Sequence, residues 1–383
     1  MKKILFILCT AMLLGLGSAA YAAEEYLMMK DNSYLAMEDG TVPSVVDTMA
    51  VIVPHREGDV LMVPLRYTFE HLGASVGWDA VANAIDIAVG DTHSKVVTGS
   101  NQAVIREASV TMPAPIIETF ERSYMDIDTV SQILQMPYEV DEEGFIYIGL
   151  IPEDKTQAKE NYAAVWKKLE GNTAEFLFED NFTEESKENW VVETDGDETE
   201  TIVTFGNGVM DTFTTKGLTI WNKHKFEGNY RVEFDADFVL GNYDFERLSD
   251  LNFFWNASDP DNPDDVFAES ATRGDFVTYN KLHLYYVGYG GNYNESTRMR
   301  KYLPTERKIV GQYLEPPFLL EEGKTLHIAV EYIDGYSKVY RNGELMFMYY
   351  DPEPYTEGNF GVRTTINHVL FSNFKAYRLV SAE

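Results

Sequence analysis

The segment FEGNYRVEFDADF, residues 226–238, carries the clearest strand pattern in the chain. From Tyr230 to Asp237, apolar residues alternate with charged ones. A period of two places one set of side chains on each face of a strand, so the segment predicts a half-buried β-strand.

Similar short runs, separated by Gly, Asn and Asp, recur through the second half of the chain. They occupy residues 174–180, 202–205, 209–214, 217–222, 251–255, 282–289, 325–333, 337–341, 344–350, 358–363 and 368–377. Asp334-Gly335 and Asn342-Gly343 lie between neighbouring runs, and such pairs favour tight hairpin turns. Many short strands without a strong intervening helix predict a mainly β fold, with a two-sheet antiparallel jelly-roll sandwich over residues 174–383.

The beginning of the chain has the features of a signal peptide. Lys2 and Lys3 precede an apolar run, and small residues follow up to Ala20-Tyr21-Ala22. The run is shorter than the roughly 20 residues that a membrane-spanning helix needs. We therefore expect residues 1–22 to be removed and the mature protein to be secreted or held at the cell surface, without a membrane span. The single cysteine, Cys9, lies in this segment, so we expect no disulfide in the mature chain.

The composition argues against nucleic acid as a partner. The chain has 62 acidic and 31 basic residues, a net charge of −31, and no long basic cluster. Aromatic residues make up 13% of the chain. Tyr and Trp rings suit the apolar faces of sugars, although β-sandwich cores use them as well.

A strand–helix–turn–strand pattern occurs twice between residues 24 and 149. The first copy covers residues 63–66, 69–74, 76–79 and 85–87, and the second covers 125–128, 131–134, 138–141 and 145–148. An internal duplication explains this repetition economically. Residues 151–173, with charged residues around Tyr162 and Trp166, predict a linker that ends in one amphipathic helix.

The VPLR string at 63–66 and the GASVGWD string at 73–79 resemble the N-terminal domain of copper amine oxidases, a small α+β stalk-like module. The second copy lacks the Pro, Arg and Trp. The resemblance implies this module over residues 23–150, with a spacing or attachment role in which a cell-wall polymer is the partner. We expect no copper site, because His55, His71 and His93 show no ligand spacing.

The C-terminal half is similar to the concanavalin-A-like lectin/glucanase superfamily. The similarity rests on residues 178–182 with Trp190, residues 226–236, VYRNG at 339–343, GNFGVR at 358–363 and FSNFKAYRL at 371–379. Residues 285–294, 297–302 and 363–368 are closest to a bacterial branch found among pectin and rhamnogalacturonan utilisation proteins. The resemblance implies a polysaccharide or oligosaccharide partner. This fold hosts lectins, hydrolases and lyases, so it does not decide between them.

A row of His and Tyr residues precedes a pair of arginines. His283, Tyr285 and Tyr289 should share one face of a strand, and Arg298 and Arg300 follow the next turn. In lysis of a uronic-acid polysaccharide, Arg neutralises the sugar carboxylate while Tyr or His moves the proton. These five residues are our predicted catalytic set, and an exposed polar strand is the alternative.

Further polar residues could line the same groove. The predicted substrate-binding residues are Trp221, Asn222, His224, Asn252, Arg363, Asn367 and His368. Some of them, His224 and Asn222 for example, fit a solvated loop equally well.

Two acidic groups offer other chemistry. Glu233, Asp235 and Asp237 share a face and resemble the carboxylate strand of retaining glucanases, although the third residue is one methylene short. Asp259, Asp261 and Asp264 crowd one loop and could hold a structural Ca²⁺, against the alternative of a solvated acidic loop. No other cofactor is expected.

The sequence thus predicts an exported carbohydrate-active protein, a polysaccharide lyase or hydrolase acting on an acidic polysaccharide. The alternatives are a non-catalytic glycan-binding module displayed at the cell surface and a surface protein whose sandwich only mediates contacts.

Overall fold

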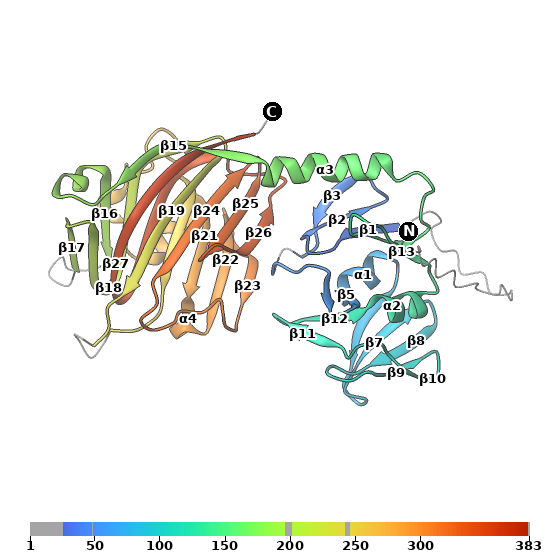
Figure 1. Cartoon of the computed structure of the whole chain (residues 1–383). Helices are drawn as coiled ribbons and strands as arrows, with labels where there is room; N and C mark the ends of the chain where they lie inside the picture. The colour runs from blue at the N-terminus through green and yellow to red at the C-terminus, as the bar shows by residue number, and fades with distance from the viewer. Residues whose placement is uncertain (1–25, 48, 196–200, 242–245, 382–383) are drawn as a thin grey trace. The chain divides into compact units, whose positions relative to one another are not determined.

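The computed structural model describes residues 26–47, 49–195, 201–241 and 246–381 (Figure 1). The predicted signal peptide lies outside these residues. The chain divides into two compact units, one of Met1–Val46 and Ile52–Val165, and one of Asp47–Val51 and Trp166–Glu383. Among the described residues, no helix combines the length and the apolar character needed to cross a membrane.

The N-terminal unit contains three small antiparallel sheets. The first has the order β13 (Tyr138–Val140), β14 (Phe145–Gly149), β1 (Tyr26–Lys30), β2 (Leu35–Glu38) and β3 (Val42–Val45). The second has the order β10 (Ala108–Thr111), β9 (Gln102–Ile105), β8 (Thr92–Val96), β7 (Ala84–Val89) and β6 (Ser75–Asp79). The third has the order β11 (Ile117–Thr119), β12 (Arg122–Asp126), β5 (Val60–Pro64) and β4 (His55–Glu57).

The predicted repetition corresponds to the same order of elements twice. β5 runs into helix α1 (Leu65–His71) and then into β6 and β7, whereas β12 runs into α2 (Ile127–Leu134) and then into β13 and β14. The two copies meet where β5 and β12 pair antiparallel. Asp126 begins α2 by accepting a hydrogen bond from the Thr129 amide, 2.8 Å away. The predicted linker helix is α3 (Thr156–Glu170).

In the described part of the C-terminal unit, thirteen antiparallel strands are joined in one sheet. They are β15 (Asn172–Asp180), β16 (Trp190–Asp195), β17 (Thr201–Gly206), β18 (Val209–Glu227), β19 (Tyr230–Phe238), β20 (Leu251–Ser258), β21 (His283–Gly290), β22 (Ser296–Leu303), β23 (Glu306–Tyr313), β24 (Leu326–Ile333), β25 (Tyr336–Arg341), β26 (Glu344–Tyr350) and β27 (Glu357–Ser381). The sequence predicted neither β16, β22 nor β23, and it divided β18 and β27 into two runs each. Asp334-Gly335 and Asn342-Gly343 form the expected hairpin turns, since all four residues have positive φ.

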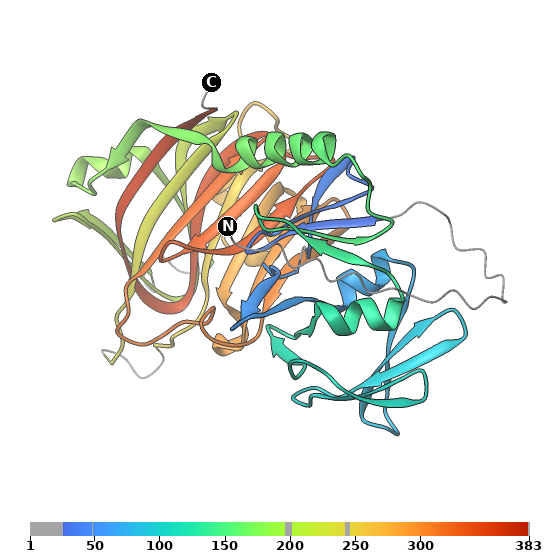
Figure 2. The same ribbon diagram turned by 45° about the vertical axis from the view of Figure 1, so that its right-hand side comes forward.

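The strands form two packed layers (Figures 1 and 2). The first layer contains β16, β20, β21, β22 and β23, and the second contains β15, β19, β24, β25 and β26. The long strand β27 pairs with β20 in its first part and with β19 and β15 in its second part. The ladder therefore continues from one layer into the other, instead of ending in two separate sheets as predicted.

Aromatic side chains fill the space between the layers. The ring of Phe234 on β19 lies 5.9 Å from that of Phe253 on β20. Phe360 and Phe371 lie 5.8 and 6.0 Å from Phe234. The Trp255 indole donates across the layers to the Ser337 hydroxyl at 3.1 Å.

We expect Phe234→Ala to lower the free energy of unfolding of the C-terminal unit by about 3–5 kcal/mol, because it leaves a cavity among these rings. Urea denaturation followed by tryptophan fluorescence measures the loss. The matched control is Phe176→Ala, because Phe176 is 59% exposed; its effect should stay below about 1 kcal/mol. Equal losses in the two variants would contradict this account of the core.

Candidate functional site

Two rows of side chains cross the side of the first layer that faces away from the second layer. Cross-strand partners share a face, so the pairing register defines each row. The first row contains Thr219, Arg363, Asn252, Gly288, Arg298 and Gln312. The second row contains Trp221, Gly361, Phe254, Tyr286 and Arg300. We call the group formed by Asn252, Tyr286, Arg298, Arg300 and Arg363 the arginine face. Arg298 and Arg300 are partly exposed, whereas the other three side chains are buried.

The predicted tyrosines do not lie on the arginine face. Because Tyr286 pairs with Arg300, its neighbours Tyr285 and Val287 point to the opposite side, into the core between the layers. Tyr285 and Tyr289 are fully buried there. The prediction that these tyrosines act beside the two arginines is therefore corrected: the tyrosine that accompanies the arginines is Tyr286.

Tyr285 belongs to a buried polar cluster in the core. Its hydroxyl donates to Asp351 Oδ2 at 2.5 Å, and Lys301 Nζ lies 2.6 Å from the same carboxylate. Burial and then the Asp351 hydrogen bond raise the pKa of Tyr285. Burial raises the pKa of Tyr289 to about 12. Both groups therefore retain their protons and suit a structural role better than that of a base.

His283 lies at the edge of the same core-facing side. Its ring stacks on Tyr355 with centroids 4.7 Å apart and an interplanar angle of 6°. Its pairing partner is Ser258 on β20. The structure therefore separates His283, as well as the two tyrosines, from Arg298 and Arg300.

The guanidinium groups of the arginine face have neutral partners. Arg298 Nε donates to Gln312 Oε1 at 2.8 Å, and Arg300 Nη1 donates to the Arg307 carbonyl at 3.1 Å. Arg363 Nη1 donates to the Thr219 hydroxyl and the Gly274 carbonyl, each at 2.8 Å. Among the described residues, none of these guanidiniums has a carboxylate within ion-pair distance.

Burial and mutual repulsion act on this cluster. Burial, and then the charges of Arg298 and Arg307, lower the pKa of Arg300. Burial raises the pKa of Tyr286, whose hydroxyl donates to Asn252 Oδ1 at 2.7 Å. Like charges held together in a partly desolvated place favour binding of an anion. Gly288 lets the Tyr286 hydroxyl lie against the sheet, because a Cβ at this position would clash with that hydroxyl.

Asp250, directly before β20, adds a carboxylate that the sequence analysis missed. It interacts electrostatically with Arg363 and Tyr286, and it accepts hydrogen bonds from Arg247 at 3.0 Å and from the Ser249 hydroxyl at 2.9 Å. Burial raises its pKa. Its φ of 63° lies in the left-handed region, which is uncommon for a non-glycine residue and frequent at functional sites.

The turn after β21 presents an exposed aromatic ring. Asn292, Tyr293 and Asn294 all have positive φ, of 54°, 60° and 67°. Tyr293 is 77% exposed, and Arg247 lies 4.8 Å from its ring centroid. Three consecutive residues in the left-handed region cost conformational free energy, and such strained segments cluster at functional sites. The turn is therefore a candidate edge of the site.

The segment between β20 and β21, residues 259–282, covers part of the side of the first layer that carries the arginine face. Tyr279 packs in a cluster with Phe254 and Tyr286, and the Phe276 ring packs against this cluster. Arg363 lies 5.1 Å from the Phe276 ring. This cover buries Arg363 and leaves Arg298 and Arg300 partly exposed.

A buried charge cluster fixes the covering segment. Arg273 Nη2 lies 2.7 Å from Asp259 Oδ2, and Arg273 Nη1 lies 3.8 Å from Glu193 Oε1. The Trp221 indole and the Tyr279 hydroxyl donate to Glu193 Oε2 at 2.9 and 2.7 Å. Trp221 is thus a buried member of this cluster, and the prediction that it binds substrate is corrected, because its side chain is removed from solvent.

The predicted metal ligands do not come together. Asp259 is buried and paired with Arg273, whereas Asp261 and Asp264 are exposed. Over the described ranges, no group of three or more His, Cys, Asp or Glu side chains is arranged to hold a metal ion. The structure therefore assigns Asp259 to anchoring the loop.

The remaining predicted binding residues lie outside the arginine face. Asn222 is buried and accepts from the His224 amide at 3.0 Å, and the His224 ring packs against Phe178 at 4.9 Å. Asn367 donates to the Ser249 carbonyl at 2.7 Å. His368 lies 2.8 Å from Asp211. Only Asn252 and Arg363 of the predicted binding set join Arg298 and Arg300.

The rival carboxylates share the outer face of the second layer, as their spacing predicts. Glu233 accepts from Arg231 at 3.0 Å, and Asp235 accepts from Asn373 at 2.6 Å and lies 2.7 Å from His327 Nδ1. They lie on the layer opposite to the arginine face and do not add to it.

We expect Asp250→Asn to raise the free energy of unfolding at neutral pH. Because burial raises the pKa of Asp250, its charged form is disfavoured in the folded state, and the penalty disappears at a pH below the ordinary carboxyl pKa. The difference in the free energy of unfolding between the variant and the unmodified protein, measured by urea denaturation, should therefore shrink as the pH falls toward the ordinary pKa of a carboxyl group. Asp261→Asn, at an exposed position, is the control. A variant destabilised at neutral pH would contradict this assignment.

Two family models match the chain. Residues 42–148 match the copper amine oxidase N-terminal domain, and residues 213–374 match a domain of unknown function, DUF6250. No curated protein matches the chain.

Solved structures similar to the C-terminal unit share little sequence with it. A Bacillus subtilis protein of unknown function with a galectin-like fold is 14% identical, with a TM-score of 0.46, and the match covers 55% of this chain and 100% of that one. A carbohydrate-binding module from Bacillus subtilis is 16% identical, with a TM-score of 0.35 and coverages of 51% and 97%. An endo-β-1,3-glucanase from Pyrococcus furiosus is 12% identical, with a TM-score of 0.40 and coverages of 56% and 97%.

The narrower likeness to pectin and rhamnogalacturonan utilisation proteins finds no support among these matches. The copper amine oxidase N-terminal domain predicted from the VPLR and GASVGWD strings is confirmed at residues 42–148, and residues 213–374 match a domain family whose function is unknown.

Proposed function

We propose that the C-terminal unit binds an acidic polysaccharide on the arginine face. The observation that carries the proposal concerns Arg298 and Arg300. Among the described residues, their guanidiniums have neutral partners and no carboxylate within ion-pair distance, in a chain of net charge −31. A protein with twice as many acidic as basic residues has ample carboxylates to neutralise these groups. Because these guanidiniums are nevertheless not paired with carboxylates, we infer that they favour an anionic ligand.

A uronic-acid sugar has the chemistry that this surface recognises. Its carboxylate can accept paired hydrogen bonds from a guanidinium, and its hydroxyls can pair with the partly exposed Gln312. Arg298 and Arg300 are two residues apart on β22 and partly exposed, so both can reach one bound chain.

We expect Arg298→Ala and Arg300→Ala each to weaken binding of uronic-acid oligosaccharides by about tenfold to a hundredfold, because each removes a charged hydrogen bond. Calorimetric titration with a panel of such oligosaccharides measures the affinity, which should also fall with added salt. Arg378→Ala removes the same charge from an exposed position on the second part of β27 and should leave the affinity unchanged. Failure of every uronate to bind, or an equal loss in the control, would refute the proposal.

Cleavage by β-elimination is the second candidate, and the placement of Asp250 favours it. Arg298 or Arg300 would neutralise the uronate carboxylate and thereby acidify the adjacent C–H. Asp250, with its raised pKa, would take that proton as the bond from C4 to the leaving oxygen breaks and the C4–C5 double bond forms. Tyr286, whose pKa is raised by burial, would return a proton to the leaving oxygen.

Elimination produces an unsaturated uronate that absorbs ultraviolet light, whereas hydrolysis produces reducing ends without it. If the protein is a lyase, Asp250→Asn and Tyr286→Phe should each slow the appearance of this absorbance by about 10²–10⁴-fold while binding persists. Asp261→Asn is the matched control. Binding without absorbance or new reducing ends in the unmodified protein would leave the non-catalytic glycan-binding module as its function.

We also propose that the protein acts outside the cell, with the N-terminal unit as its attachment or spacing module. The apolar leader-like segment at residues 4–17 and the copper amine oxidase N-terminal domain support this proposal. Fractionation of the producing cells, with the protein found in the cytoplasm only, would refute it.

A further inference from the structure

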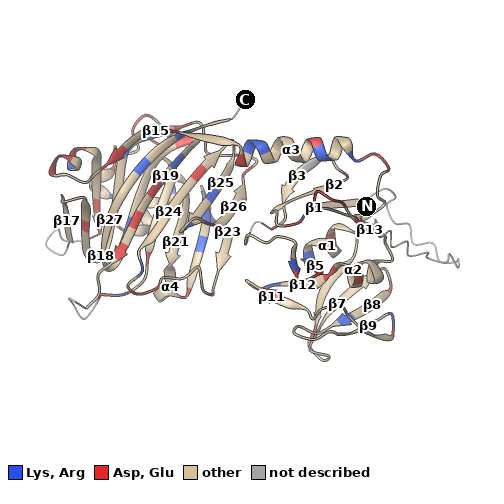
Figure 3. Cartoon of the chain, in the orientation of Figure 1, with Lys and Arg blue, Asp and Glu red and all other residues tan. Residues whose placement is uncertain are grey.

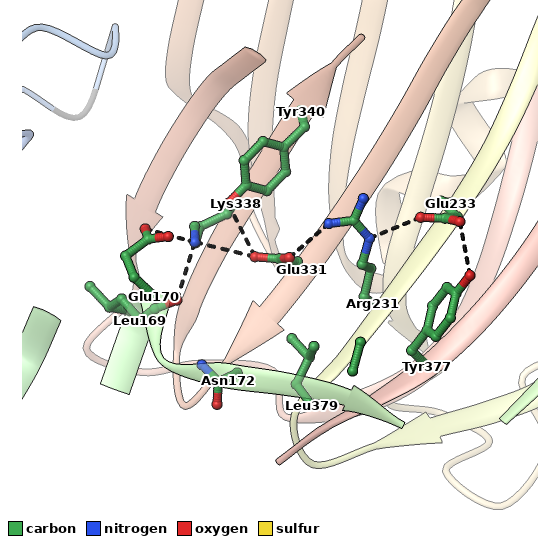
Figure 4. Close-up of a pocket in the computed structure, with 11 residues that line it drawn as sticks. Leu169, Glu170, Asn172, Arg231, Glu233, Glu331, Lys338, Tyr340, Tyr377 and Leu379 are labelled. Atoms are coloured by element: carbon green, nitrogen blue, oxygen red, sulfur yellow. Dashed lines mark hydrogen bonds and ion pairs between the residues drawn. The ribbon is translucent and has the colours of Figure 1, made fainter. Parts of the chain in front are cut away.

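A separate pocket lies on the outer surface of the second layer, the layer opposite to the arginine face. Its volume is about 320 Å³, within the range of small-molecule sites. Its polar lining includes Arg231, Glu233, Glu331, Lys338, Tyr340 and Tyr377, and Glu170 and Asn172 complete it at one end (Figure 4).

Five neighbouring strands position these side chains. Tyr377 on β27 pairs with Arg231 on β19, Arg231 pairs with Glu331 on β24, and Glu331 pairs with Lys338 on β25. Phe176 on β15 pairs with Tyr377 at the other end and extends the row. Because the row belongs to paired strands and not to loops, its geometry is fixed before any ligand arrives.

Hydrogen bonds connect the polar groups into one chain, which the dashed lines of Figure 4 follow from Glu170 to Tyr377. Arg231 donates to Glu233 and to Glu331, both at 3.0 Å. Tyr377 donates to Glu233 Oε1 at 3.0 Å, and Tyr340 donates to Glu331 Oε2 at 3.2 Å.

The charges of the pocket differ from those of the arginine face. Lys338 is buried, and its ammonium group lies 2.9 Å from Glu170, 3.2 Å from Glu331 and 3.2 Å from the Leu169 carbonyl. Glu170, Glu233 and Glu331 therefore outnumber Arg231 and Lys338 by one carboxylate. An anionic ligand would be repelled here, whereas a neutral hydroxyl can accept from Arg231 and donate to Glu233 or Glu331.

Tyr340 and Tyr377 line the pocket, and Phe176 lies next to it, against Tyr377. Phe176 is 59% exposed, and its ring meets that of Tyr377 edge to face at 6.0 Å. Tyr340 and Tyr377 are half-buried, with their hydroxyls in the hydrogen-bonded chain. The exposed Phe176 ring offers an apolar surface, and the carboxylates and the guanidinium beside it offer polar contacts. A sugar ring matches this arrangement, because it has an apolar face and hydroxyl groups at its edge.

We propose that this pocket binds a neutral oligosaccharide, with Phe176 as a stacking surface and Glu233, Glu331 and Arg231 as partners of its hydroxyls. The site is distinct from the arginine face and independent of the acidic ligand proposed for it. The sandwich then carries two glycan sites of different charge preference on opposite layers.

Binding of a panel of neutral gluco-, manno-, galacto- and xylo-oligosaccharides to the full-length protein tests the proposal by calorimetric titration. At least one should bind, and Glu233→Gln should weaken it by about tenfold or more through loss of charged hydrogen bonds. Phe176→Ala, an exposed change that leaves the fold intact, should weaken the same ligand severalfold. Glu357→Gln, at an exposed carboxylate on β27, should have no effect.

The arginine-face variant Arg298→Ala separates the two sites. It should leave neutral oligosaccharide binding unchanged while it weakens uronate binding. The proposal fails if no neutral oligosaccharide binds, if Glu233→Gln and Phe176→Ala both bind as tightly as the unmodified protein, or if Arg298→Ala abolishes neutral sugar binding.

Discussion

The pairing register of β20, β21, β22 and β27 is the constraint on which the arginine face depends. Since side chains alternate between faces, a slip of one residue in β21 would exchange Tyr286 for Tyr285 on the arginine face. The aromatic core opposes such a slip, because Trp255 and Tyr285 stack at 5.6 Å between the layers. Packing of the core thus determines which polar residues lie on the arginine face.

Buried charges determine how much of that side is open. Glu193, Arg273 and Asp259 are removed from solvent, an arrangement that is stable only when the partners satisfy one another. Trp221, Tyr279 and Ser270 complete the hydrogen bonding of Glu193. The cluster ties the covering segment to the first layer, and the rings of this segment shield Arg363 but not Arg298.

The sequence predicted most strands of the sandwich, the hairpin turns and the repeated N-terminal pattern, because periodicity and turn chemistry are local. It also predicted Asn252, Arg298, Arg300 and Arg363 of the arginine face. It misplaced Tyr285 and Tyr289, because the relative phase of two strands depends on their pairing and not on either strand alone. The sequence did not indicate Asp250 as a site residue, because what distinguishes this carboxylate is its burial near Arg363 in the folded structure. Basic and acidic residues are interspersed along the sandwich strands in Figure 3, and sequence spacing cannot show which of them meet.

The two sides of the sandwich use their charges in different ways. On the second layer, Arg231 and Lys338 are each held between carboxylates, so the network is nearly balanced and stabilises the sheet. On the first layer, Arg298 and Arg300 have no carboxylate within ion-pair distance among the described residues, and Asp250 near Arg363 has a raised pKa. Both features reduce stability. Residues that reduce stability are expected at sites of binding or catalysis, where function and not stability decides which residues are kept. This contrast, more than the fold, is the reason for proposing acidic sugar recognition on the first layer.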